Sequence, residues 1–333
     1  MPKNVNPIIE CVPNFSEGRN QDVIDSIATS IRNVKGVQLL HVDIGFDANR
    51  TVMTFAGKPD AVVEAAFQAI KKASELIDMS LQKGAHPRFG ATDVCPLIPI
   101  ANISMNQVVE YSKILAKRVG DELEIPVYLY ENSASSEKRK DLAYLRKGEY
   151  ESIVDKIESE EWVPDFGPQN FNAKTGNIAI GARNFLIAFN VNLKSNNLEL
   201  ARKIATEVRT KRFKNKEYST NKNCAALKAI AWEMAEYNCV QVSTNIVDYN
   251  KTGLHDAFEA IKAVAKQFKI ETDGSELIGL IPLSAIVSAG KFYSDNDITD
   301  EKNLIEVANR ALGLSRIKKF DPKERVIEYL LSK

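Results

Sequence analysis

The stretch VQLLHVDIGFDANRTVMTFAGKPDAVVEAAFQAIKKASELIDMS, residues 37–80, contains two strand-like runs followed by one helix-like run. VQLLHVD and RTVMTFAG are apolar runs of strand length, and the turn-rich IGFDAN between them predicts two adjacent strands. The next segment places Val63, Phe67 and Ile70 on one helical face, and Pro59 falls in its first turn, where proline is tolerated. This order predicts a helix that packs on a sheet.

Strands and helices alternate on both sides of this stretch. PIIECVP and GRNQDVIDSIATSIRNV precede it, and TDVCPLIPI, SMNQVVEYSKILAKRVGDEL and IPVYLY follow it. From residue 178 on, IAIGARNFLIAFNVNL, NLELARKIATEVR, AALKAIAWEMAEYN, CVQVSTNIVD and GLHDAFEAIKAVAKQF repeat the element order without a residue repeat. The expected fold is α/β (α+β), with two lobes, 1–178 and 179–333. Each lobe is expected to hold a mixed β-sheet of split β-α-β (ferredoxin-like) element order with helices on one face.

The composition is that of a globular protein with a small-molecule partner. A chain of 333 residues suits two compact units. Lysine plus arginine and aspartate plus glutamate number 44 each, so no single-sign field favours nucleic acid or an anionic membrane. The sequence shows neither a membrane-spanning apolar run nor a signal-peptide pattern, so a cytoplasmic location is expected. The four cysteines lack C-x-x-C spacing, which favours reduced, buried thiols and no metal site.

KGAHPRFGATDVCP, residues 83–96, holds one of the three histidines. The residue before a proline is pushed toward extended backbone, so His86 is expected in a loop, where Gly84 and Gly90 permit close approach of a ligand. Histidine takes and gives protons near neutral pH, which makes His86 a candidate general acid/base. Arg88 would face the same side and hold a carboxylate. The alternative is that His86 only decorates an exposed loop.

Other polar residues gather where the predicted strands end. VPNFSEGRN and HVDIGFDANRTV are expected either to bind a ligand or to supply caps and turns. Asp43, at the end of a strand, is positioned to orient a histidine through its second ring nitrogen. His41 shares a strand face with Val37 and Leu39, and His255 falls in the first turn of a helix, so structural roles are expected for both histidines.

Ten sequence blocks, in order along nearly the whole chain, resemble one family. They are ECVPNFSEGRN, NRTVMTFAG, IDMS, GAHPRFGATDVCP, IPVYLY, PDFGP, GARNFLIAFNVNL, QVSTNIVDY, LIGLIPLSA and PKERVIEYL. The chain resembles glutamate formimidoyltransferase. The resemblance implies transfer of a formimidoyl group between N-formimidoyl-L-glutamate and tetrahydrofolate, giving 5-formimidoyltetrahydrofolate and L-glutamate in histidine degradation. It also implies a groove between two α/β lobes that binds folate, a homodimer, and His86 as the catalytic acid/base.

The stretch VPDFGPQNFNAKTGN, residues 163–177, follows a charged segment of expected short surface helices and predicts a linker or a functional loop. The resemblance places the family's folate loop here. The residues that match the family pattern are Gly167, Pro168, Phe171 and Gly176. The same loop holds residues that follow the pattern less closely, which are Gln169, Asn170, Asn172, Ala173, Lys174 and Thr175. Backbone contacts to the pterin are therefore expected to persist, and Lys174 is expected to meet the glutamyl carboxylates of folate.

Formimidoyl transfer requires a base, because an amine attacks carbon only when it is unprotonated. We expect His86, oriented by Asp43, to take a proton from the attacking amine and return it to the departing nitrogen, without a covalent enzyme intermediate. Arg50, Arg88 and Arg183 are the candidates for binding the carboxylates of the substrates, by charge and loop placement.

Three alternatives remain open. The same site would suit formyl transfer between 5-formyltetrahydrofolate and glutamate, and the same fold would suit a non-catalytic folate-binding protein. A nucleophilic Cys95 is the third, although this residue lies in an apolar strand with no base nearby in sequence. Vertebrate relatives carry a fused cyclodeaminase, and because this sequence ends at VIEYLLSK, that activity is expected on a separate chain if present.

Overall fold

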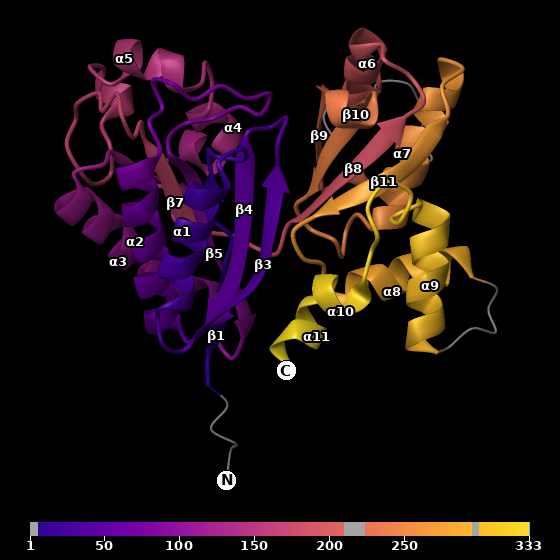
Figure 1. The fold of residues 1–333 in the computed structure, drawn as a ribbon, viewed down its shortest axis with the longest axis horizontal. Coiled ribbons are helices and arrows are strands. Elements are labelled where there is room, and N and C mark those ends of the chain that lie inside the picture. The colour runs from indigo at the N-terminus through magenta and orange to yellow at the C-terminus, as the bar shows by residue number, and fades with distance from the viewer. Residues whose placement is uncertain (1–5, 210–223, 295–299, 333) are drawn as a thin grey trace. The chain divides into compact units, whose positions relative to one another are not determined.

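The chain forms two compact units, and each has its own sheet and its own hydrophobic core. The computed structural model describes residues 6–209, 224–294 and 300–332. The first unit is Met1–Asn184 and the second is Phe185–Lys333. The division lies beyond the expected boundary at 178/179, because the strand that begins at residue 178 belongs to the first sheet. The expected α/β architecture with two sheets is confirmed (Figure 1).

Among the described residues, the first unit is built on a seven-stranded mixed sheet. Its strands are β1 (Ile8–Cys11), β2 (Asn14–Phe15), β3 (Val37–Gly45), β4 (Arg50–Gly57), β5 (Thr92–Ala101), β6 (Val127–Glu131) and β7 (Ile178–Ala182). The order is β1-β4-β2-β5-β7-β6, and β3 pairs with β4. Strand β7 runs parallel to β5 and β6, whereas β1 and β2 each pair antiparallel with β4 and β5.

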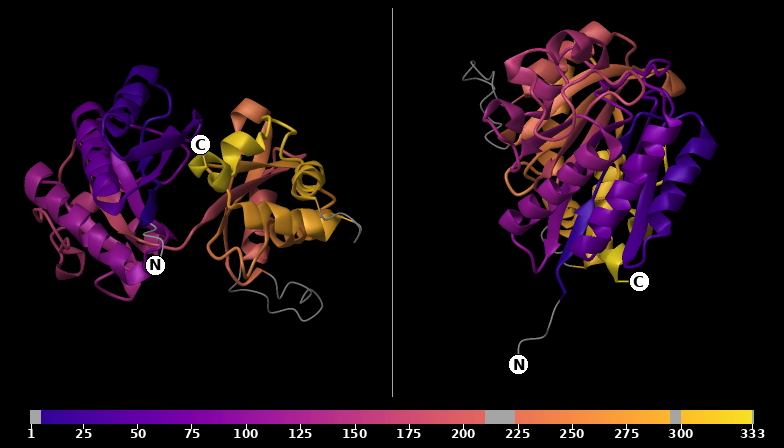
Figure 2. Two further views of the ribbon diagram at one scale, coloured as in Figure 1. Left: turned by 90° about the horizontal axis from the view of Figure 1, so that it is seen from below. Right: turned by 90° about the vertical axis from the view of Figure 1, so that its left-hand side faces the viewer.

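Three long helices cover one face of this sheet side by side, as Figure 1 and the view from below in Figure 2 show. They are α1 (Gln21–Arg32), α2 (Pro59–Leu76) and α3 (Met105–Leu123). Pro59 is the first residue of α2, as predicted, and the Asn20 side chain caps α1. The face of α2 that was predicted to be apolar is buried at Val63, Phe67 and Ile70. The helical periodicity therefore identified the packing face correctly.

Short helices fill the charged segment between β6 and β7, as predicted. They are η1 (Lys138–Lys140), α4 (Leu142–Leu145), η2 (Tyr150–Ser152), α5 (Ile153–Lys156) and η3 (Glu160–Trp162). They are not only surface elements, because Leu145, Tyr150, Ile153 and Trp162 are buried. The segment is therefore anchored to the core of the first unit.

Within residues 185–209, 224–294 and 300–332, the second unit has a four-stranded sheet of order β11-β8-β10-β9. In chain order its main elements are β8 (Ile187–Leu193), α6 (Leu198–Val208), β9 (Leu227–Met234), β10 (Cys239–Ile246), α7 (Leu254–Gln267), β11 (Thr272–Ile278), α8 (Leu283–Tyr293), α9 (Glu301–Leu312), α10 (Pro322–Arg325) and α11 (Ile327–Leu331). The expectation of a mixed sheet was wrong for this unit, because its strand pairings are antiparallel.

The run IAIGARNFLIAFNVNL, expected as one strand-like segment, contains two strands that belong to different units. β7 is buried on both faces and lies between β5 and β6, while β8 pairs with β10 and β11. Residues 183–186 between them form no strand. Periodicity could not show this break, because both strands are apolar.

The cysteines and the helices can be compared with the expectations of reduced thiols and of no membrane-spanning segment. All four cysteines are free, and Cys11, Cys95 and Cys224 are buried while Cys239 is half-buried. This agrees with the expected reduced thiols. In the part of the chain that the structure describes, no helix combines the length and the apolar character needed to cross a membrane.

Candidate functional site

His86 lies in the loop that joins α2 to β5, as the sequence predicts. Side chains from neighbouring elements hold this loop. The Nδ2 of Asn49, in the turn between β3 and β4, donates to the carbonyl of Lys83 at 2.9 Å. The hydroxyl of Ser16 donates to the carbonyl of Gly90 at 2.7 Å. The polar residues that follow the strands therefore fix the loop at both of its ends.

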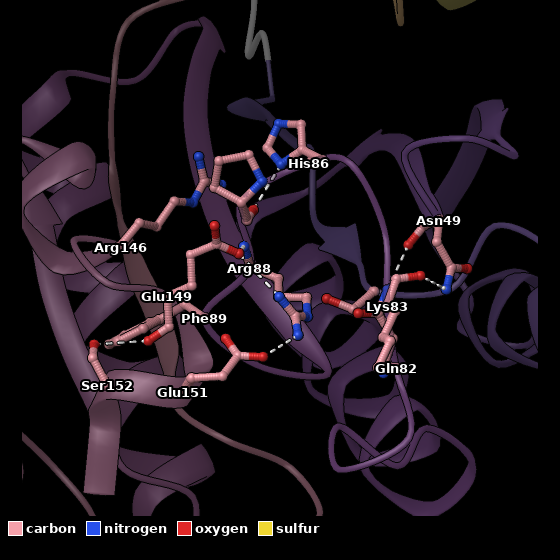
Figure 3. Close-up of polar contacts among 12 residues, drawn as sticks. Asn49, Gln82, Lys83, His86, Arg88, Phe89, Arg146, Glu149, Glu151 and Ser152 are labelled. Carbon is pink, nitrogen blue, oxygen red and sulfur yellow. Dashed lines mark hydrogen bonds and ion pairs between the residues drawn. The ribbon is translucent and has the colours of Figure 1, made fainter. Parts of the chain in front are cut away.

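The backbone sets the tautomer of His86. The side chain is half-buried, and its Nδ1 lies 2.7 Å from the carbonyl oxygen of Pro87 (Figure 3). A carbonyl oxygen only accepts hydrogen bonds, so Nδ1 carries the proton of the neutral ring. The lone pair of the neutral imidazole is then on Nε2. His86 is thereby prepared to accept a proton at Nε2.

Two arginines and one aspartate lie beside His86. Asp93 is fully buried, and its Oδ2 accepts hydrogen bonds from Arg50 Nη2 at 2.5 Å and from Arg146 Nη2. Its Oδ1 accepts from Arg146 Nε at 3.2 Å. Arg50 Nη1 lies 3.5 Å from the carbonyl of Pro87, the oxygen that also holds His86. Asp93 therefore fixes two cations close to the histidine.

These charges shift the pKa values of the group. Burial, and then repulsion from Arg50 and Arg146, lower the pKa of His86 well below 6.5, although Asp93 opposes this shift. Burial also lowers the pKa of Arg50 to about 10. Burial acts to raise the pKa of Asp93, but Arg146 and Arg50 outweigh it and hold that pKa well below its usual range. At neutral pH His86 is therefore an uncharged base beside two cations and one anion.

Sequence reasoning did not select Asp93 or Arg146. Asp93 lies in the block TDVCP and is a carboxylate at the start of an otherwise apolar strand, which is a signal that a buried charge needs a partner. Arg146 lies in the charged segment before β7, where nothing in the local pattern distinguishes it from its neighbours. Its role follows only from the contact with Asp93.

The other predicted proton-transfer residue, Asp43, lies in β3. Its Oδ2 is 3.6 Å from Nε2 of His41. The contact at Nδ1 of His86 is the Pro87 carbonyl, so orientation of His86 by Asp43 stays a prediction. His255 stacks on the ring of Phe292 with centroids 4.4 Å apart, as suits a structural residue.

Arg88 is buried and bonded to two glutamates. Its Nη1 pairs with Glu149 at 3.0 Å and its Nη2 pairs with Glu151 (Figure 3). Glu151 is exposed and Glu149 is half-buried. Both Nη atoms of Arg88 are thus engaged by carboxylates of the protein, and its role in binding a substrate carboxylate stays a prediction.

The other two predicted arginines also have partners in the first unit. Arg50 is bonded to Asp93, as described above. Arg183 follows β7 and donates from Nη1 to the carbonyl of Asn184 at 2.9 Å, a contact with its own neighbour in sequence. Binding of substrate carboxylates by Arg50 and Arg183 likewise stays a prediction.

The expected folate loop, 167–176, packs against the loop that carries His86. Gly90 and Gly176 form an isolated antiparallel bridge. The N–H of Ala91 donates to the carbonyl of Thr175 at 2.8 Å. Two segments that are far apart in sequence are therefore joined by backbone hydrogen bonds.

The two matched glycines at the ends of this loop have positive φ. Gly167 has a φ of +83° and Gly176 a φ of +61°, a region that side chains disfavour. A Cβ on Gly167 would lie 2.4 Å from the carbonyl oxygen of Ile125, and one on Gly176 would lie 2.7 Å from that of Phe89. Glycine is required at both positions for conformation and for space.

Lys174 and Asn172, within the loop, form hydrogen bonds with protein atoms. Lys174 Nζ donates to the carbonyl of Glu75 at 2.9 Å, near the C-terminal end of α2, where a cation is favourable. Asn172 Oδ1 accepts from the N–H groups of Lys174 and Thr175, each at 3.1 Å. Contact of Lys174 with folate carboxylates therefore stays a prediction.

The rest of the loop packs on the short helices before β7. The rings of Phe171 and Tyr150 have centroids 5.5 Å apart, and the hydroxyl of Tyr150 donates to the carbonyl of Ala173 at 2.6 Å. Gln169 Nε2 donates to the carbonyl of Ile157 at 2.8 Å. Pro168 is half-buried and Asn170 is exposed. The loop is thus supported along its length.

Asn177, directly after the loop, is a buried amide without a hydrogen-bond partner. The side chain is fully buried, and neither Nδ2 nor Oδ1 has a partner among the described residues. The hydroxyl of Thr92, at the start of β5, is in the same situation. Unsatisfied buried polar groups destabilise the fold, so these atoms mark a place where water or a ligand is expected.

A cleft of about 650 Å³ in the first unit is lined in part by the beginning of the loop that carries His86. It is lined by Glu17, Arg19, Asn20, Gln21, Asp22, Asn49, Leu76, Ile77, Asp78, Leu81 and Gln82. Its lining includes neither His86 nor the loop 167–176. The cleft is therefore a separate feature from the charged cluster.

The environment of Cys95 does not favour a nucleophilic role. Cys95 is fully buried, with its Sγ 3.5 Å from that of Cys11, and burial raises the pKa of Cys11. This arrangement suits structural thiols rather than a nucleophile. Within the described ranges, no group of three or more His, Cys, Asp or Glu side chains is arranged to hold a metal ion.

Two family profiles match nearly the whole chain. The Formiminotransferase domain, N-terminal subdomain, matches residues 8–183, and the Formiminotransferase domain matches residues 188–332. Each match falls within one of the two compact units. The family subdomains thus correspond to the units that the structure shows.

Curated relatives align along the same length. Formimidoyltransferase-cyclodeaminase from Mus musculus is 45% identical over 97% of this chain, which spans 60% of that relative. Glutamate formimidoyltransferase from Streptococcus pyogenes serotype M1 is 41% identical over 92% of this chain and 99% of that protein. The enzyme of the same name from Thermoplasma acidophilum is 40% identical over 90% of this chain and 96% of its own length. From the two profile matches and these identities, the chain belongs to the formiminotransferase family.

Proposed function

We propose that this chain is a glutamate formimidoyltransferase that moves the formimidoyl group between N-formimidoyl-L-glutamate and tetrahydrofolate in histidine degradation. Support comes from two relatives of that name that align over nearly their whole length. The observation that carries the mechanism is the hydrogen bond between His86 Nδ1 and the Pro87 carbonyl. It leaves Nε2 of the neutral ring as the proton acceptor.

In this mechanism His86 is the general acid/base. Nε2 takes the proton of the tetrahydrofolate amine as that nitrogen bonds to the formimidoyl carbon. The tetrahedral intermediate then collapses, the bond from that carbon to the glutamate nitrogen breaks, and Nε2 returns the proton to the departing nitrogen. One carbon–nitrogen bond forms and one breaks, with no covalent bond to the protein. General acid/base catalysis of this kind contributes roughly 10²–10⁴ in rate.

The loop 167–176 is the part of the first unit that we assign to the pterin. It is joined to the His86 loop by the bridge between Gly90 and Gly176. Asn177, next to it, offers one donor and one acceptor that lack partners among the described residues. A pterin edge carries both N–H donors and acceptor atoms, so the chemistry of this buried amide fits the ligand.

Steady-state turnover of N-formimidoyl-L-glutamate with tetrahydrofolate, followed as 5-formimidoyltetrahydrofolate, tests the proposal. We expect His86→Ala to lower kcat by at least about a hundredfold while folate binding is retained. His255→Ala is the matched control, because His255 lies in the second unit and stacks on the ring of Phe292, and it should retain turnover. Equal kcat in His86→Ala and the unmodified protein would remove His86 from the mechanism.

The same assay separates the two other functions considered. If the protein turns over 5-formyltetrahydrofolate with glutamate but does not transfer the formimidoyl group, its activity is formyl transfer. Folate binding without turnover of either donor would point to a non-catalytic binding protein. If the protein turns over both donors, the ratio of their kcat/KM values gives the preferred donor.

A further inference from the structure

Arg146 reaches the His86 site from a different element than the residues around it. It caps the C-terminal end of α4 (Leu142–Leu145), and its side chain extends toward the loop that carries His86 (Figure 3). Its Nε and Nη2 both donate to Asp93, which holds the guanidinium in a fixed plane. Asp93 is itself held by the N–H of Phe89 at 2.8 Å. The position of Arg146 is therefore preset by buried contacts.

The third guanidinium nitrogen of Arg146, Nη1, is available for a ligand. Its Nη1 has no hydrogen-bond partner among the described residues, and the side chain is 17% exposed, so a ligand can reach it. Arg50 and Arg88 differ from it in this respect, because both of their Nη atoms contact protein oxygens. Nε of Arg88 also lacks a partner, but that atom is buried, so of these three arginines only Arg146 has an Nη atom that contacts no protein oxygen among the described residues.

The charges that act on His86 leave room for an anion. They are the cations of Arg50 on β4 and Arg146 after α4, and the anion of Asp93 on β5. With neutral His86 these three groups carry one excess positive charge. A partly buried cation without a full counter-charge favours a bound carboxylate.

We infer that Arg146 binds the α-carboxylate of the amino-acid substrate through Nη1, with Asp93 as the residue that positions it. This inference rests on the proposed formimidoyl transfer. The α-carboxylate and the reacting nitrogen are attached to the same carbon of glutamate, so a cation beside His86 is suited to this carboxylate rather than to the distant γ-carboxylate. Arg146 thereby places the departing nitrogen next to Nε2 of His86.

The test compares donors that differ by one carboxylate. N-formimidoyl-4-aminobutyrate lacks only the α-carboxylate of N-formimidoyl-L-glutamate, and N-formimidoyl-2-aminobutyrate lacks only the γ-carboxylate. In the unmodified protein, we expect kcat/KM to fall about ten- to a hundredfold when the α-carboxylate is removed, the usual effect of losing a charge-assisted hydrogen bond. In Arg146→Gln, the ratio of kcat/KM for N-formimidoyl-L-glutamate to kcat/KM for N-formimidoyl-4-aminobutyrate should approach one. The fall in kcat/KM when the γ-carboxylate is removed should stay the same as in the unmodified protein.

Arg139→Gln is the matched control. Arg139 lies in the same segment, is similarly buried and pairs with Asp165 at 2.9 Å, so its loss removes a comparable ion pair. The preference for the α-carboxylate should survive this change. If Arg146→Gln does not melt cooperatively, Arg146→Lys replaces it, because a single ammonium cannot hold Asp93 with two nitrogens and also present a third to the substrate. An unchanged preference in the folded Arg146 variant overturns the inference.

Binding measurements separate this inference from the proposed function. Calorimetry with L-glutamate and with 4-aminobutyrate needs no turnover. Weaker glutamate binding in Arg146→Gln, with 4-aminobutyrate binding unchanged, supports the carboxylate site even where formimidoyl transfer is absent. If the unmodified protein is active and Arg146→Gln binds glutamate equally well, the role of Arg146 is refuted and the proposed function is retained.

Discussion

At the scale of single residues, a backbone carbonyl defines the chemistry of His86. The Pro87 oxygen engages Nδ1 without adding a full negative charge, so the imidazolium gains little stabilisation from it. The two nearby arginines act in the opposite direction and favour the neutral ring. The site therefore presents a base at neutral pH, and Asp93 is the residue that keeps both cations there.

The pH dependence of turnover follows from this shift. Because the pKa of His86 in the folded protein lies well below 6.5, the base form persists as pH falls through 6.5. The acid limb of kcat/KM, which reports the ligand-free protein, is expected below pH 6.5, and Arg146→Gln, which removes one cation, should move it to higher pH. Comparing the two proteins with the same substrates cancels the ionisation of the substrates. An acid limb that coincides in both proteins would show that Arg146 does not lower the pKa of His86.

Asp93→Asn should destabilise the first unit. It leaves the buried Arg50 and the half-buried Arg146 without their shared counter-charge, a change that costs about 3–5 kcal/mol. The free energy of unfolding from urea titration measures it. Asp121→Asn is the control, since Asp121 forms an exposed pair with Lys117 that contributes at most about 1 kcal/mol. Similar losses in both variants would mean that the buried cluster does not stabilise the fold.

At the scale of elements, two loops that were identified separately form one unit. The segment after α2 and the segment before β7 meet at the bridge between Gly90 and Gly176. Gly90 lies so close to its neighbour that a Cβ there would be 2.0 Å from the carbonyl oxygen of Asn177. The absence of a side chain at Gly90 therefore permits the contact between the expected folate loop and the His86 loop.

Gly90→Ala tests this close approach. The added methyl group would force the two loops apart, and overpacking of this kind costs roughly 1–3 kcal/mol. We expect a lower melting temperature and weaker folate binding. Gly45→Ala is the control, because its Cβ would meet neighbours only at 3.4 Å. Unaltered folate binding in a destabilised Gly90→Ala protein would mean that the contact serves stability alone.

At the scale of the whole molecule, the two units hold separate cores. The buried cluster of the first unit runs from Ile9 to Ala182, and that of the second runs from Ile187 to Val326. The charged cluster around Asp93 and the loop 167–176 lie entirely in the first unit. A homodimer, a cytoplasmic location and a folate groove between lobes stay predictions.

A fragment of residues 6–184 should therefore fold by itself. It retains the whole first sheet and its covering helices, so no strand loses its pairing partner. We expect cooperative thermal unfolding by circular dichroism and dispersed amide signals by NMR. The fragment 185–332 serves as the comparison. A first-unit fragment without cooperative unfolding would show that the units depend on each other for stability.

The sequence by itself determined the α/β class, the packing face of α2, the loop position of His86 and the family, because periodicity, proline and glycine placement and ordered motif blocks are local features. Only the tertiary structure decided that 178–193 divides between two sheets, that the second sheet is antiparallel and that Pro87 sets the histidine tautomer. It also decided the partners of Asp93, since Arg50 and Arg146 lie 43 and 53 positions away along the chain. Local pattern carries no record of such distant pairings, and electrostatic interactions depend on distance in space rather than on separation in sequence.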